Sequence, residues 1–187
     1  MMRRRGVRII GMAAVAVAVY AASEEANSCQ RKFDEIAGEQ LRPGTRVVFS
    51  LRELNAWAAA NVPPGVRDTR IAIPSAGIAV GSAMIDFARL EQGQGRQPGW
   101  IMQKLLSGER PVSVTARIRS GGGEATVDVQ RVEVSGLQID GSTLQFLIDN
   151  ILLSMYPDAA VGRPFELSHR MERLDVQPSG VTVAIGK

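Results

Sequence analysis

The fold is decided by the stretch VSVTARIRSGGGEATVDV, residues 112–129. Apolar and polar residues alternate on both sides of the turn at 120–123, and a period of two is typical of a strand with one buried face. The pattern predicts an antiparallel hairpin whose apolar half faces a core and whose polar half faces water.

Strand pairs are also predicted on both sides of this central hairpin, and each pair follows a helix. The first helix begins with a capping box, Ser50-Leu51-Arg52-Glu53, in which the serine and the glutamate satisfy free backbone amides. Prolines at 63 and 64 end it near Asn61. The predicted order is a helix at 51–61, strands at 66–73 and 77–90, a helix at 100–106, the central hairpin, a helix at 142–155, and strands at 165–176 and 181–185.

These elements predict an α+β fold, in which one highly twisted antiparallel sheet of about six or seven strands curls around apolar helices. The helix at 142–155 carries the longest apolar stripe and needs cover on most of its circumference. Aromatic residues make up only 5% of the chain. A core built from aliphatic side chains can be fully packed, or it can leave a slot for a flexible apolar guest.

The N-terminal segment has the layout of an export signal. Four arginines at positions 3, 4, 5 and 8 precede an apolar run from Ile9 to Ala22, which is shorter than the roughly 20 residues of a membrane-spanning helix. We therefore predict a signal peptide at 1–23, with small residues at 21–23 as cleavage sites. The alternative is an uncleaved anchor held in the inner membrane through residues 7–22. Either case predicts a periplasmic protein.

After this leader, we expect a helical stalk or linker at 24–42 and a single α+β domain at 43–187. Cys29 falls in the stalk and is expected to be exposed or near the membrane; a lipoprotein is disfavoured because 26–28 lacks the apolar residue of a lipobox. The net charge of +3 becomes −1 without the four leader arginines. The basic charge is therefore read as a translocation signal, and no nucleic-acid partner is expected.

Three short motifs resemble small extracytoplasmic domains related to the tubular lipid-binding (TULIP-like) superfamily. They are VVFSLRELNAW at 47–57, VDVQRVEVSGL at 127–137 and RLDVQPSGVTV at 173–183. In such domains a strand, a helix start of this type and a long hairpin begin a sheet that curls around a helix. The resemblance implies binding of a lipid or other acyl-chain ligand in an apolar groove at the cell envelope.

Two functional hypotheses follow. The first is a periplasmic carrier or sensor of lipid-like molecules with an apolar slot, and the second is an envelope adaptor that pairs with another protein through an exposed sheet edge. Ordinary core packing is the simpler interpretation of Trp57, of Trp100 and of the helix at 142–155. The residues proposed to line the slot are Leu54, Trp57, Ile101, Leu105, Leu144, Leu147, Ile148 and Ile151.

The sequence contains no recognisable catalytic set. His169, the single histidine, is expected to be a solvated strand residue, and the glycines at 121–123 read as a hairpin turn instead of a phosphate loop. The acidic residues at 128, 133, 140 and 149 do not have metal-ligand spacing. We therefore predict a protein that is not an enzyme and that uses no metal or cofactor.

Overall fold

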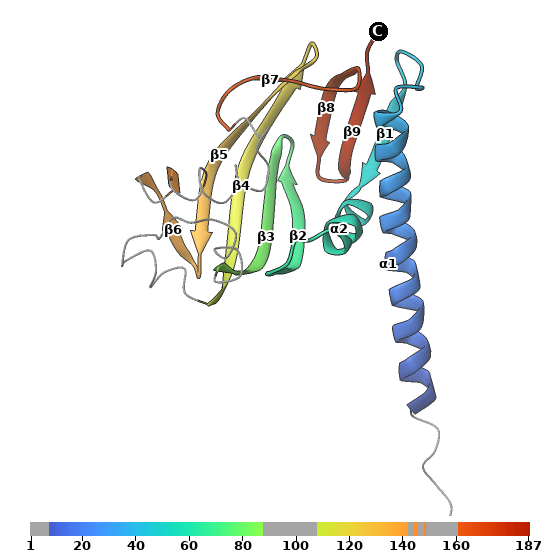
Figure 1. Ribbon diagram of the computed structural model, residues 1–187, viewed down its shortest axis with the longest axis vertical. Helices are drawn as coiled ribbons and strands as arrows, with labels where there is room; N and C mark the ends of the chain where they lie inside the picture. The colour runs from blue at the N-terminus through green and yellow to red at the C-terminus, as the bar shows by residue number, and fades with distance from the viewer. Residues whose placement is uncertain (1–7, 88–107, 142–143, 146–147, 149–160) are drawn as a thin grey trace, which may run out of the picture.

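The computed structural model describes residues 8–87, 108–141, 144–145, 148 and 161–187. Within these residues the protein is α+β, with two helices and two antiparallel sheets (Figure 1). The elements are α1 (Arg8–Ala37), β1 (Arg46–Ser50), α2 (Leu51–Ala60), β2 (Val66–Ser75), β3 (Ile78–Asp86), β4 (Glu109–Gly121), β5 (Glu124–Val134), β6 (Leu137–Ile139), β7 (Phe165–Glu166), β8 (Met171–Gln177) and β9 (Gly180–Ile185).

The larger sheet contains six strands in the order β2-β3-β4-β5-β6, with β7 also paired to β5. The predicted central hairpin is confirmed, since β4 and β5 pair as far as Gly121 opposite Glu124. Gly122 and Gly123 form its turn with φ angles of 63° and 84°, which favour glycine. The predicted pair at 66–73 and 77–90 is confirmed as β2 and β3, but positions 88–90 and the helix expected at 100–106 lie outside the described residues.

The last two strands, β8 and β9, join β1 in a second sheet with the order β1-β9-β8. The prediction of a single sheet did not include this second sheet. The strand predicted over 165–176 is also divided, because β7 pairs with β5 whereas β8 pairs with β9. His169 and Arg170 separate the two pieces and have φ angles of 54° and 58°. Two successive residues with left-handed backbone turn the chain away from the extended path of β7, and it changes sheets at this point.

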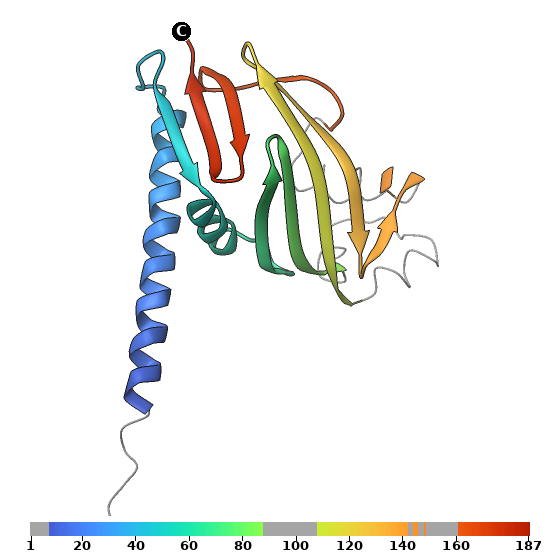
Figure 2. The ribbon, with the colours of Figure 1, turned by 180° about the vertical axis from the view of Figure 1, so that it is seen from behind.

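Hydrogen bonds join the two sheets along β8. Ser120 Oγ donates to the Leu174 carbonyl and accepts from the Leu174 amide, both at 2.8 Å. Gly77 N donates to the Val176 carbonyl at 2.9 Å. The turns of the larger sheet therefore occupy backbone groups on the edge of β8, and the views from both sides show the smaller sheet between α1 and the larger sheet (Figures 1 and 2).

The first hydrophobic core lies between α1, α2 and the smaller sheet. Cys29 and Ile36 of α1 are buried in it, and the Phe33 ring packs against Phe49 and Trp57 with centroid distances of 4.8 Å and 5.0 Å. The segment expected as a stalk thus contributes to a core. The prediction of an exposed Cys29 is wrong: its side chain is 0% exposed, because α1 packs against β1 and α2 instead of leading away from them.

Among the helices of the described part of the chain, none combines the length and the apolar character that crossing a bilayer requires.

Candidate functional site

A second hydrophobic cluster identifies the inner face of the larger sheet. Phe87, Val132, Val134 and Ile139 are its buried members. Side chains that pack against them come from three strands and from the start of the segment that follows β6. These partly buried members are Ile85, Val112, Val114, Val129 and Leu144.

Small residues occupy the same face of β3. Ala83 is paired with Val112 and Gly81 with Val114, and directly paired residues of an antiparallel sheet share a face. Ala79 follows at the next alternate position. No side chain on this face of β3 between 79 and 83 extends beyond Cβ. A Cβ built on Gly81 would meet no heavy atom of the described residues within 4 Å, so none of their side chains fills the space above it.

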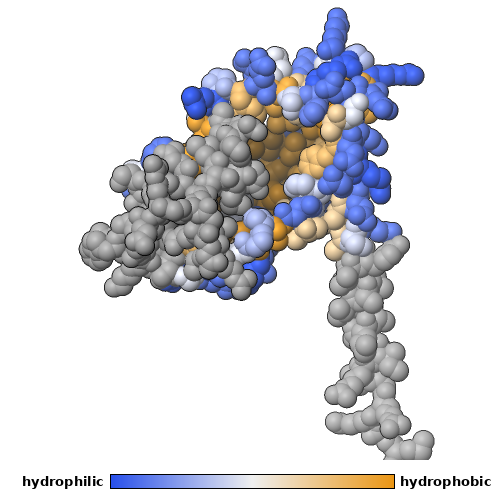
Figure 3. All heavy atoms as spheres, in the orientation of Figure 1, coloured by the Kyte–Doolittle hydropathy of each residue, from blue (hydrophilic) through white to orange (hydrophobic). Residues whose placement is uncertain are grey.

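We call this feature the trough: its floor is Ala79, Gly81 and Ala83 of β3, and its walls are Ile71 of β2 and Val114 of β4. Register supports both walls, since Gly81 is paired with Ile71 on one side and Val114 on the other. Gly81 is exposed and the other four residues are half-buried. Figure 3 shows an apolar hollow near the middle of the face that is seen in this view. The trough can accept an apolar group without displacing a described side chain.

The proposed slot residues are divided between the two clusters. Leu54 and Trp57 pack in the first cluster, where Trp57 Nε1 donates to Gln30 Oε1 at 2.7 Å. Leu144 packs in the second cluster, so the structure does not bring it together with the two α2 residues. Ile148 is half-buried. The remaining proposed residues, Ile101, Leu105, Leu147 and Ile151, lie outside the described residues.

The sequence analysis did not include the floor of the trough among the predicted site residues. Its signal was present, because Ala79, Gly81 and Ala83 are three small residues at alternate positions of a predicted strand. Glycine within a strand often marks the close approach of another group. The prediction instead selected large apolar side chains, because the helix predicted at 142–155 carries a long apolar stripe.

Glu53 forms the most highly connected polar cluster of the described residues. Its Oε1 accepts from Lys32 Nζ at 2.5 Å and from Ser28 Oγ at 2.7 Å, and its Oε2 accepts from the Ser50 amide at 2.8 Å. Burial would raise the pKa of Glu53, but these hydrogen bonds outweigh it and lower the pKa to about 2. The carboxylate is therefore ionised at neutral pH and saturated with donors.

Cys29 lies beside this cluster but is unsuited to nucleophilic chemistry. Burial and then the negative charge of Glu53 raise the pKa of the thiol to about 11. The thiolate is the reactive form, and it is negligible at neutral pH. Glu53 cannot take up a proton at that pH either. The cluster is therefore a set of structural polar contacts that connect α1 to the start of α2.

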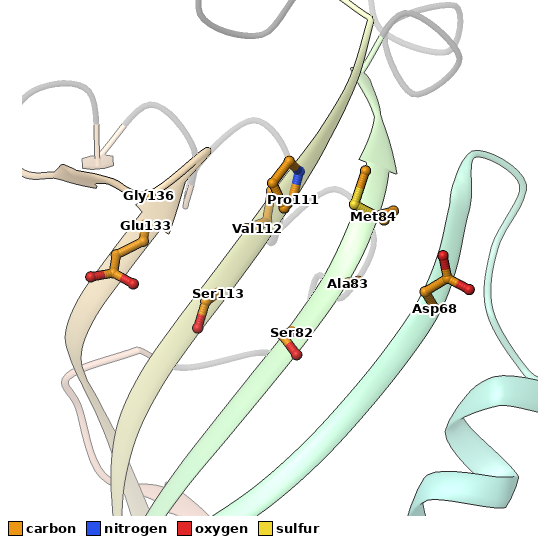
Figure 4. Close-up of a pocket in the computed structure, with 9 residues that line it drawn as sticks. All are labelled: Asp68, Ser82, Ala83, Met84, Pro111, Val112, Ser113, Glu133 and Gly136. Carbon is orange, nitrogen blue, oxygen red and sulfur yellow. The ribbon is translucent and has the colours of Figure 1, made fainter.

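A cavity of about 330 Å³ lies on the opposite, outer face of the larger sheet (Figure 4). Its polar groups are the hydroxyls of Ser82 and Ser113 and the carboxylates of Asp68 and Glu133. Asp68 is paired with Arg67, and Glu133 with Arg131 at 3.4 Å. In the described part of the chain, no three histidine, cysteine or acidic residues gather as metal ligands would. This cavity is therefore a weaker candidate site than the trough.

The fold and the trough define a class: an α+β protein with an open apolar trough on the inner face of an antiparallel sheet. No protein-family model, curated protein or solved structure matches the chain.

Proposed function

We propose that this protein is an exported, non-enzymatic envelope protein that binds a lipid or another apolar ligand in the trough. The observation that carries the proposal is the space above Gly81, which no described side chain fills, on an apolar face formed by three strands. Apolar surface in contact with water is unfavourable, and each methylene buried there would contribute about 0.8 kcal/mol. A flexible acyl chain suits a floor made of small residues.

The periplasmic location belongs to the same proposal. It rests on the arginines and the apolar run of segment 1–23, which act either as a cleaved signal peptide or as an inner-membrane anchor. We further propose that the two sheets curl around apolar helical segments, as in the TULIP-like domains that the sequence motifs resemble. Support for this arrangement comes from Leu144, the first apolar residue of the predicted stripe, which packs on the inner face.

Pairing through a sheet edge is the second candidate function. The two large apolar side chains most exposed among the described residues lie on edge strands: Val48 on β1 is 57% exposed and Leu137 on β6 is 60% exposed. Side chains already occupy other edge groups, however. Asn55 accepts from the Ile71 amide and donates to the Ile71 carbonyl, and Lys32 donates to the Val48 carbonyl. Such caps disfavour strand addition at β1 and β2, which leaves β6 as the edge strand that this second function would use.

Native mass spectrometry tests the proposal. The protein would be expressed from its full sequence and purified from a bacterial periplasm, and its native mass would be measured before any bound material is extracted with solvent. We expect a defined mass increment over the mass of the polypeptide, and we expect the extracted material to be a lipid. A clean ligand-free mass, unchanged after incubation with envelope lipids, would overturn the proposal and favour the adaptor function.

Two variants locate the ligand. Gly81→Leu fills the trough, whereas Ser82→Leu places the same side chain on the outer face of the same strand. We expect the mass increment to disappear in the Gly81 variant and to remain in the Ser82 variant. Retention in both variants would place the ligand elsewhere.

A further inference from the structure

Arg110 is a cation on the apolar inner face of the larger sheet. It is paired with Ile85, and Val112 and Val114 follow it at alternate positions of β4. Because these three neighbours pack against the second cluster, the register places Arg110 on the same face. Its Nε atom is buried and has no hydrogen-bond partner among the described residues. Buried donors are normally paired, so this one requires an explanation.

Thr69 provides a second, independent observation on the other side of β3. The register moves from Arg67 opposite Met84 to Arg70 opposite Ser82, so an extra β2 residue is accommodated beside Ala83. Alternation from Ile71 places Thr69 on the inner face. Its Oγ1 is the other buried side-chain nitrogen or oxygen atom of the described residues that has no hydrogen-bond partner.

Both unpaired groups therefore flank the same end of the trough. Arg110 is beside Ile85 and Thr69 is beside Ala83, whereas the floor continues toward Ala79. The nearby cation on the outer face differs, since Arg67 is held by Glu109 with a distance of 2.5 Å and also by Asp68. An open apolar floor that leads to an unpaired guanidinium N–H and an unpaired hydroxyl is complementary to a ligand with an apolar chain and an anionic end.

We propose that the trough binds a long-chain fatty acid, with the acyl chain along β3 and the carboxylate at Arg110 and Thr69. This inference rests on the proposed function and specifies its ligand. Guanidinium groups bind carboxylates with charge-assisted hydrogen bonds, and the threonine hydroxyl adds a further donor. The floor from Ala79 to Ala83 spans about 13 Å at the rise of a strand, and it is one strand wide. That shape suits one acyl chain better than two.

Three probes of the same chain length test the charge preference of the full-length protein, expressed from its complete sequence and stripped of lipid. They are hexadecanoate, hexadecanol and hexadecyltrimethylammonium, and their affinities are measured by equilibrium binding. We expect hexadecanoate to bind about 10-fold to 100-fold more tightly than the alcohol, as for a hydrogen-bonded charge, and the cation to bind most weakly.

Substitutions assign the preference to Arg110. Arg110→Met keeps an apolar stem and removes the charge, and we expect it to abolish the preference for the acid while hexadecanol affinity changes little. Arg110→Lys should keep part of the preference. Arg117→Met is the matched control, because Arg117 is an exposed residue of β4 on the opposite face. It should leave the preference intact.

The outcomes separate this inference from the proposed function. Equal affinity for acid and alcohol in the wild-type protein, or a preference that survives Arg110→Met, would overturn the fatty-acid inference but leave apolar binding in the trough standing. Binding of a two-chain phospholipid with exclusion of hexadecanoate would also overturn it. Failure to bind any of the probes or any envelope lipid would overturn both proposals.

Discussion

Lys32 of α1 and Glu53 in the first turn of α2 form an ion pair with an Nζ–Oε1 distance of 2.5 Å. The same ammonium group donates to the Val48 carbonyl at 2.6 Å, so this one lysine of α1 contacts both β1 and α2. Glu53 is only 7% exposed. This ion pair makes the second half of α1 part of the folded unit.

Loss of the Lys32 ammonium should destabilise the protein. Lys32→Met leaves a buried carboxylate without its cation, and we expect the free energy of unfolding to fall by about 2 kcal/mol, since the lysine is partly solvated. Urea unfolding at pH 7 measures the change. The matched control is Arg52→Met. Arg52 forms an ion pair with Glu25, but the Arg52 side chain is 77% exposed. If Arg52→Met lowers the free energy of unfolding as much as Lys32→Met does, the loss cannot be assigned to the unpaired carboxylate of Glu53.

Acid should weaken the fold through Glu53. Its pKa is about 2 in the folded protein against an ordinary value of 4.5, so the folded state favours the ionised form. The resulting stability, about 3 kcal/mol at most, is present above pH 4.5 and is lost as the pH falls toward 2. Urea midpoints between pH 2 and pH 6 should decline less steeply in Glu53→Gln than in the wild-type protein. If the urea midpoints of the two proteins fall equally with pH, groups other than Glu53 dominate the loss of stability in acid.

Thr69→Val should stabilise the ligand-free protein. The change removes a buried hydroxyl that has no hydrogen-bond partner and keeps the shape of the side chain. We expect a gain of about 1 kcal/mol in the free energy of unfolding. Thr115→Val, on the outer face of β4, is the comparison, with an expected change within about 0.5 kcal/mol. A loss of stability at position 69 would mean that the hydroxyl is satisfied in solution.

Cys29 should resist thiol reagents while the protein is folded. It is fully buried, and burial raises its pKa to about 11. Labelling with an aromatic disulfide at pH 8 should therefore proceed only as the protein unfolds, and should become fast in denaturant. Ser168→Cys places a second thiol at an exposed position and should be labelled at once. Rapid labelling of both thiols would show that α1 separates from the core in solution.

Local patterns explain the parts of the fold that were predicted well. The capping box of α2 needs only Ser50 and Glu53 three positions apart, and both of its hydrogen bonds are present. The β4–β5 hairpin needs only alternation and the glycines of its turn. The division into two sheets was not predicted, because a pattern of alternation does not specify which strand a given strand will pair with.

The candidate site was harder to predict for the same reason. Trp57 and Leu144 are both apolar residues on predicted helices, and nothing in their neighbourhoods indicates that they belong to different clusters. The small residues of β3 were visible, but their significance depends on the open space above Gly81. The side chains on either side of that space, Ile71 and Val114, are set by the pairing of β2 and β4 with β3.

Short-range patterns were enough to predict the hairpins and the start of α2, because each depends on residues a few positions apart. The burial of Cys29, the contact of Lys32 with Glu53, and the positions of Thr69 and Arg110 at one end of the trough come from the tertiary structure alone. These relationships join residues far apart in the chain. Their physical basis is the burial of apolar faces against one another, which selects neighbours that no local pattern specifies.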